Sequence, residues 1–151
     1  MHIYLACDHA GFEHKEVLKH WLTQLGKYEV TDCGAYTLDP EDDYPDFIAR
    51  AAAAVSSHPS QCKAIIFGGS GQGEAMLANQ FPSVRATVYY GHEPSMLQLS
   101  REHNDANILS IGARFVAVDE TVSIVETWLS YDSAQDERHI RRLKKSASLR
   151  P

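Results

Sequence analysis

A glycine-rich segment followed by a glutamate is the arrangement in this sequence that most resembles a catalytic site. Residues 68–73 read GGSGQG, and Glu74 follows them. Backbone N–H groups of such a segment can converge on an anion. A carboxylate beside an oxyanion-binding loop suits proton abstraction next to a carbonyl, because the base takes the C–H proton while the N–H groups hold the charge that develops on oxygen.

Each part of this arrangement also has an ordinary explanation. The glycines are compatible with a tight strand-to-helix turn, and Glu74 with a first-turn acid that complements the helix dipole. A helix terminus lowers the pKa of a carboxyl and burial raises it, so the sequence leaves the pKa of Glu74 open. It is the combination of loop and carboxylate that favours chemistry.

Two further polar groups follow expected elements. Asp8 and His9 come directly after an apolar run, where histidine can donate to a ring oxygen or a phosphate and aspartate can move protons between hydroxyls. A turn with a helix N-cap is the equal alternative. His103, Asn104 and Asp105 follow a polar helix end, for which the ordinary reading is a C-terminal turn with Asn104 in the left-handed conformation.

Three arginines are candidates for anion binding. Arg114 lies just after the last expected strand, while Arg138 and Arg142 are four residues apart and therefore share one helical face. Two guanidinium groups on one face suit a phosphate monoester. A solvated basic helix is the ordinary explanation for that pair.

Composition narrows the class of protein. The chain has 151 residues, the size of one domain, and its net charge of −6 argues against nonspecific binding to nucleic acid or membranes. The three cysteines form no CxxC pair and read as reduced thiols. The start of the chain lacks a signal-peptide pattern, and no apolar stretch is long enough for a membrane span. We therefore expect a cytoplasmic location.

Apolar strands alternate with helical patterns along the chain. We expect strands at 3–7, 28–31, 64–67, 84–89 and 108–111, helices at 12–25, 45–58, 74–80, 94–102, 120–130 and 133–145, and a frayed tail at 146–151. This alternation predicts βαβ units, a parallel sheet and helices on both of its faces, in one domain over 1–151. Ligands of such folds sit beyond the carboxyl ends of the strands, which selects Asp8–His9, the glycine segment and the turn after the last strand.

Several short segments occur together in an order typical of one family. They are ACDHAG at 6–11, DYPD at 43–46, GGSGQGE at 68–74, AN at 78–79, REHNDAN at 101–107, GAR at 112–114, and RH at 138–139 with Arg142. With these segments the chain resembles the type B ribose-5-phosphate isomerases, which include bacterial galactose-6-phosphate and allose-6-phosphate isomerases. The likeness covers nearly the whole chain.

One departure from the family pattern concerns the base. Many members carry a cysteine immediately before the G-[ST]-G part of the loop, and its thiolate transfers the proton. Here that position is Gly69, and the sequence resembles the branch in which a glutamate replaces the thiolate. The resemblance thus assigns the base to Glu74. Cys7 is not at the family's cysteine position and is left out of catalysis.

The resemblance also implies roles for the other candidates. His103 would assist opening of the sugar ring, and Asp8 would move the proton between O1 and O2. Ser70 and the backbone N–H groups of residues 71–74 (Gly71, Gln72, Gly73 and Glu74) would stabilise a cis-enediolate. The phosphate would be held by His9, Arg114, Arg138 and Arg142, and sugar hydroxyls would be contacted by Tyr44 and Asn104.

The implied protein is an α/β enzyme with a five-stranded parallel sheet in a Rossmann-like three-layer α/β/α sandwich. It needs no metal or organic cofactor. It forms a dimer or a dimer of dimers, with the His103–Asn104 and Arg114 side of each site supplied by the partner chain. The expected reaction converts ribose 5-phosphate to ribulose 5-phosphate. The same chemistry on a hexose 6-phosphate and a non-catalytic phosphosugar-binding protein are the alternatives.

Overall fold

Strands and helices alternate along the chain, as the apolar pattern predicts. The computed structural model describes residues 1–133 and 136–149. Its strands are β1 (His2–Cys7), β2 (Glu29–Asp32), β3 (Cys62–Gly68), β4 (Ala86–Tyr89) and β5 (Ile108–Gly112). Its helices are α1 (Phe12–Leu25), α2 (Pro45–Ser57), α3 (Gln72–Ala78), α4 (Ser95–Glu102), α5 (Thr121–Ser130) and α6 (Glu137–Ser148), with short 3₁₀ turns η1 (His9–Gly11) and η2 (Val118–Glu120).

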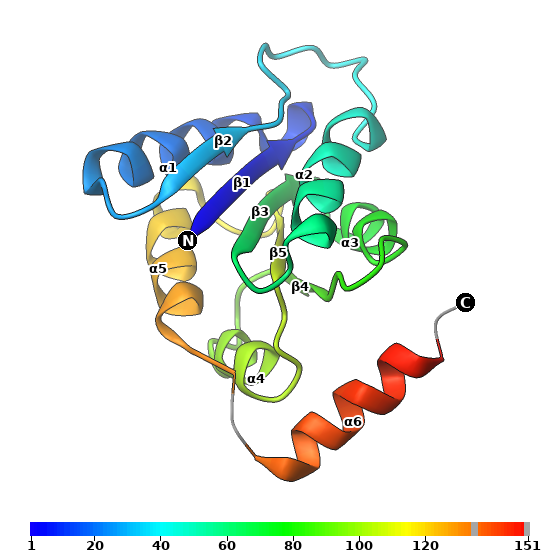
Figure 1. The fold of residues 1–151 in the computed structure, drawn as a ribbon. Helices are drawn as coiled ribbons and strands as arrows, with labels where there is room; N and C mark the ends of the chain where they lie inside the picture. Colours follow the sequence, from blue (N-terminus) through cyan, green and yellow to red (C-terminus); the bar gives the residue numbers. More distant parts are fainter. Residues whose placement is uncertain (134–135, 150–151) are drawn as a thin grey trace.

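All five strands form one parallel sheet, which confirms the expected fold class. The strand order is β2-β1-β3-β5-β4 (Figure 1). Cys7 at the end of β1 pairs with Phe67 of β3, and Gly68 at the end of β3 pairs with Gly112 of β5. The carboxyl ends of β1, β3 and β5 therefore lie side by side at one edge of the sheet.

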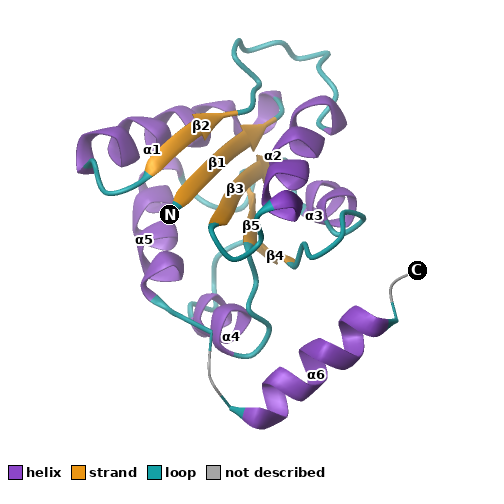
Figure 2. Cartoon of the chain, in the orientation of Figure 1, coloured by secondary structure: helices purple, strands orange, loops and turns teal. Residues whose placement is uncertain are grey.

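Helices cover both faces of the sheet (Figure 2). The helices α1, α4 and α5 pack on one face, and α2 and α3 pack on the other. Side chains of a strand alternate between faces, so that Ile65 and Phe67 of β3 enter the first layer while Ala64 and Ile66 enter the second. This gives the α/β/α sandwich a separate apolar core on each side.

Most element boundaries differ from those expected by one or two residues, and the differences in α3 and α6 bear on the site. The helix α3 begins at Gln72, two residues before Glu74, because the left-handed Gly71 already turns the chain. The helix α6 runs from Glu137 to Ser148, so the expected frayed tail is wrong for residues 146–148. Residues 134 and 135 of the expected last helix, and 150 and 151 of the expected tail, lie outside the described residues.

In the described part of the chain, no helix is both long and apolar enough to cross a bilayer.

Candidate active site

The three places selected from the sequence meet at one edge of the sheet. Asp8 follows β1, the glycine segment follows β3 and Arg114 follows β5 shortly after its end. Since these three strands are neighbours and parallel, the residues beyond their carboxyl ends converge. The prediction of a ligand-binding edge thus has a direct structural basis.

The glycine segment is braced by the strand beside it. Gly71 has a φ of 76°, which favours glycine, and its carbonyl accepts a 2.7 Å hydrogen bond from the buried hydroxyl of Ser110 in β5. The Ser70 hydroxyl accepts from the backbone N–H of Gln72 at 3.3 Å. The Gln72 amide contacts the hydroxyl of Tyr90, after β4. These contacts fix the turn that starts α3.

Glu74, in the first turn of α3, turns its carboxyl group back onto the end of β3. Only 5% of Glu74 is exposed. A methyl group built on Gly68 would lie 1.9 Å from Glu74 Oε1 and 2.0 Å from its Cδ, so the carboxyl occupies the space that the missing side chain leaves. Gly68 is therefore a requirement for the position of this acid.

Burial decides the pKa of Glu74. Desolvation, the largest effect, raises the pKa of this carboxyl, the hydrogen bond from the backbone N–H of Glu74 itself lowers it by less, and the negative charge of Asp8 adds the smallest increase. Of the two opposing effects that the sequence left open, burial is the larger. A carboxylate with a raised pKa is a stronger base, which suits removal of a carbon-bound proton.

Asp8 combines a structural contact with proximity to Glu74. It is 8% exposed and its Oδ1 accepts from the backbone N–H groups of Ala10 at 3.0 Å and Gly11 at 3.3 Å. The N-cap reading of this aspartate is thus confirmed. Its charge also acts on the carboxyl of Glu74, so both acids belong to the same cluster.

The basic side chains of Arg114 and His9 lie at the same edge. The Arg114 guanidinium covers Gly69, where a methyl group would be 3.3 Å from its Cζ and Nε. The hydrogen bond with Asp42 raises the pKa of His9, against opposing effects of burial and of Arg114. Because β5 adjoins β3, Arg114 reaches the loop of its own chain, and the expectation that a partner supplies it is wrong.

Tyr44 reaches the cluster from the start of α2. Its hydroxyl would lie 3.1 Å from a methyl group built on Gly73. Pro45 begins α2 directly after it, at a position where a missing N–H costs nothing. The aromatic side chain therefore stands over the glycine segment, as a sugar-contacting residue would.

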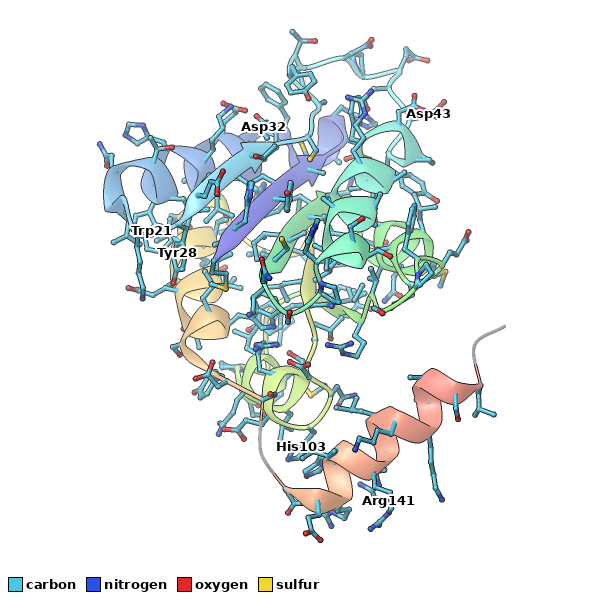
Figure 3. The ribbon with its side chains drawn as sticks, in the orientation of Figure 1. Trp21, Tyr28, Asp32, Asp43, His103 and Arg141 are labelled. Atoms are coloured by element: carbon cyan, nitrogen blue, oxygen red, sulfur yellow. The ribbon has the colours of Figure 1, made fainter. Side chains whose placement is uncertain are left out.

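His103 and Asn104 lie elsewhere. They follow α4, which connects the parallel strands β4 and β5 and so returns the chain to the amino edge of the sheet. The His103 ring stacks on His139 of α6, with centroids 4.1 Å apart and planes 10° apart. Figure 3 shows His103 and Arg141 at one end of the molecule and Asp43 toward the other. Arg138 and Arg142, exposed on α6, belong to the His103 end.

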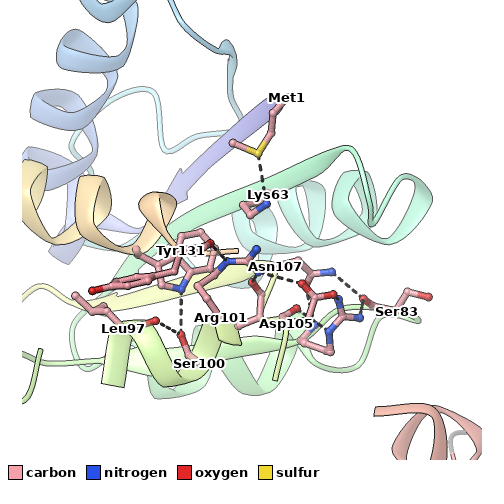
Figure 4. Close-up of polar contacts among 12 residues, drawn as sticks. Met1, Lys63, Ser83, Leu97, Ser100, Arg101, Asp105, Asn107 and Tyr131 are labelled. Carbon is pink, nitrogen blue, oxygen red and sulfur yellow. Dashed lines mark hydrogen bonds and ion pairs between the residues drawn. The ribbon is translucent and has the colours of Figure 1, made fainter. Parts of the chain in front are cut away.

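The turn that carries His103 is held rigidly. Asp105 accepts from Arg85 at 2.7 Å and from Arg101 at 3.2 Å, and the almost buried Arg101 also donates to the carbonyl of Tyr131 (Figure 4). Asp105, with a φ of 45°, takes the left-handed conformation that the turn reading assigned to Asn104. The conformation leaves Asn104 exposed.

Two residues that support the cluster were not singled out from the sequence. Asp42 holds His9, and Ser110 holds Gly71. Asp42 stands among several acids of one loop, and nothing in the local pattern distinguishes it. Ser110 is a polar residue inside an apolar strand, which is the one signal that could have been followed.

Cys7 is buried against the core and is a poor candidate for a base. Desolvation, the largest effect, raises the pKa of its thiol to about 12. The thiolate is therefore scarce near neutral pH. Within residues 1–133 and 136–149, the histidine, cysteine and acidic side chains form no group that could hold a metal ion.

Replacing Cys7 by serine tests this assignment. We expect kcat to stay within about threefold of the wild-type value, because no proton passes through this thiol. Initial rates at saturating substrate measure the effect, with thermal unfolding as the control for packing at this buried site. A loss as large as that from removing the Glu74 carboxylate would move the base to Cys7.

Comparisons with known proteins place the chain in a family. The model of the ribose/galactose isomerase family matches residues 3–146. Ribose-5-phosphate isomerase B of Mycolicibacterium paratuberculosis is 39% identical over 143 residues, which cover 95% of this chain and 87% of the relative. The crystal structure of the Mycoplasma genitalium enzyme with bound ribulose 5-phosphate has a TM-score of 0.90 at 31% identity, covering 97% of this chain and 94% of that one.

A second solved structure leads to the same family. Ribose-5-phosphate isomerase B of Clostridium thermocellum superposes with a TM-score of 0.89 at 38% identity, covering 99% of this chain and 97% of that one. The match extends over both the carboxyl-edge cluster and the His103 end. The chain therefore belongs to the ribose/galactose isomerase family and is an aldose–ketose isomerase.

Proposed function

We propose that this chain interconverts ribose 5-phosphate and ribulose 5-phosphate, with Glu74 as the base. One observation carries the proposal: the Glu74 carboxyl lies against Gly68 while the Arg114 guanidinium covers the adjacent Gly69. A base and a cation for the phosphate thus stand side by side at the carboxyl edge. The names of the relatives support ribose 5-phosphate as the substrate.

The proton transfer follows from this arrangement. Glu74 removes the proton from C2 of the open-chain aldose and returns it to C1, through a cis-enediolate. The Ser70 hydroxyl and the backbone N–H groups of residues 71–74 stabilise the negative oxygen. Asp8 moves the proton between O1 and O2, and Tyr44 contacts a sugar hydroxyl. His9 and Arg114 bind the phosphate from the same chain.

We further propose that a second copy of the chain completes each site. His103, Asn104, Arg138 and Arg142 lie at the opposite end of the same chain, so an intramolecular site leaves them unused. In a dimer, the partner's His103 opens the furanose ring, its Asn104 contacts the sugar and its two arginines bind the phosphate. We also propose that the chain is one isomerase domain over 1–151 that forms a dimer or a dimer of dimers in the cytoplasm and uses no cofactor.

Mixing two inactive variants tests the shared site. Glu74→Gln and His103→Asn should each be inactive as pure proteins. After dissociation and random reassociation, we expect recovery of about a quarter of wild-type activity, because half the dimers are mixed and each has one intact site. Each variant carried through the procedure alone is the control. Mixed dimers without activity would place all the residues of a site in one chain.

A substrate panel tests the reaction. We expect ribose 5-phosphate to give the highest kcat/KM among pentose 5-phosphates and hexose 6-phosphates of the allose and galactose type. A hexose 6-phosphate with far higher kcat/KM would replace the named substrate and retain the chemistry. Tight binding of the sugar phosphates without any turnover would identify a phosphosugar-binding protein.

A further inference from the structure

Asp42 makes an unusual double contact with His9. A single carboxylate oxygen, Asp42 Oδ1, accepts from the backbone N–H of His9 at 3.0 Å and pairs with His9 Nδ1 at 2.8 Å. The two residues are 33 positions apart, in the loop before α2 and in the turn after β1. The contact therefore fixes both the main chain and the ring of His9.

The burial of this pair is uneven. The Asp42 side chain is 8% exposed, whereas that of His9 is 30% exposed. The second oxygen, Asp42 Oδ2, is buried and has no hydrogen-bond partner among the described residues. Holding a carboxylate in such a place costs free energy unless a positive charge compensates it. The nearest candidate for that charge is the imidazolium form of His9.

The charges around His9 come from three elements. Asp42 in the loop and Asp8 at the end of β1 favour the protonated ring, and Arg114 after β5 opposes it. Because Nδ1 of His9 faces Asp42, Nε2–H is the remaining ring donor that can bind a ligand. A charged ring beside Arg114 provides two cations for one phosphate.

We infer that Asp42 is a positioning residue that holds His9 as an imidazolium, with Nε2–H available to the phosphate of the substrate. The inference rests on the proposed function, in which His9 binds that phosphate. Asp42 itself touches no reacting atom. Its effect should therefore appear in binding of the phosphate and in its dependence on pH, and not in the proton transfer.

The conservative variant Asp42→Asn keeps the shape and an acceptor oxygen but removes the charge. We expect the KM for ribose 5-phosphate to rise about tenfold, because the hydrogen bond from His9 to the phosphate loses its charge assistance, with kcat within about twofold. In the wild type, KM should rise as pH increases through the pKa of His9. In the variant that rise should occur at lower pH, since the raised pKa needs the carboxylate.

The matched control is Glu41→Gln. Glu41 is exposed and lies next to Asp42 in the same loop. Its replacement by glutamine therefore removes the same charge as Asp42→Asn without changing the contact with His9. We expect wild-type KM, kcat and pH profile. The double variant His9→Gln/Asp42→Asn adds a second test. If Asp42 acts through His9, the KM of the double variant should equal the KM of His9→Gln alone.

Two measurements remain readable if the protein fails to act on ribose 5-phosphate. NMR titration of the His9 ring should show a lower pKa in Asp42→Asn than in the wild type, and inorganic phosphate should bind more weakly to the variant. Failure of the substrate panel with these two results intact would overturn the named substrate only. An unchanged His9 titration, or a fall in kcat with an unchanged KM, would overturn the role of Asp42.

Discussion

Glu74→Gln is expected to lower kcat by at least about a hundredfold, the lower range for loss of a general base. Glutamine keeps the shape of the side chain and fills the same space against Gly68, but it cannot accept the C2 proton. The KM for ribose 5-phosphate should change little, because phosphate binding rests on other groups. Initial rates in both directions of the reaction measure the effect.

The pH profile distinguishes chemistry from folding in this variant. In the wild type, kcat/KM should fall as pH drops through the Glu74 pKa, at values above the ordinary 4.5 of a glutamate. Because the folded-state pKa is raised, the charged carboxylate destabilises the fold above that pH, so the glutamine variant should be at least as stable at neutral pH. Near-normal turnover by the variant would contradict the assignment of the base.

Gly68→Ala is expected to cause a loss of similar size without touching any catalytic group. The added methyl group would lie 1.9 Å from Glu74 Oε1, so the carboxyl must move by more than an ångström or α3 must shift. A displacement of about 1 Å can reduce a rate about a hundredfold. The loss should appear mainly in kcat.

Gly69→Ala is the matched comparison for this prediction. The nearest atoms to its methyl group would belong to the guanidinium of Arg114, at 3.3 Å, and that flexible side chain can adjust. We therefore expect a moderate rise in KM and a kcat close to that of the wild type. Equal kcat losses in the two variants would show that the whole loop is sensitive, and would remove the special role of Gly68. Thermal unfolding of both variants checks the fold.

The fold can be predicted from the sequence because short local patterns of apolar residues indicate its strands and helices. Short apolar runs such as 64–67 and helical spacings such as 12–25 report burial directly, and their alternation implies parallel strands. The boundaries of α3 and α6 were less accessible. The start of α3 depends on a single left-handed glycine, and α6 packs through His139 against His103, and no periodicity encodes either feature.

Some residues of the candidate site can likewise be predicted from local sequence, and others cannot. The sequence predicts Asp8, the glycine segment and Glu74 as site residues because they stand beside strand ends, where ligands of such folds bind. The contact of Asp42 with His9 joins segments 33 residues apart, so local patterns contain no sign of it. The resemblance assigns Arg114 to the partner chain, whereas the strand order brings β5 beside β3 and Arg114 to the loop of its own chain.

Deuterium incorporation in D₂O tests the central claim most directly. Ribose 5-phosphate is held at equilibrium with the protein, and NMR follows deuterium at C1 of ribulose 5-phosphate and at C2 of ribose 5-phosphate. If Glu74 is the base, deuterium appears at both positions with the wild type, and labelling is at least about a hundredfold slower with Glu74→Gln. Labelling by Glu74→Gln at the wild-type rate would contradict the account.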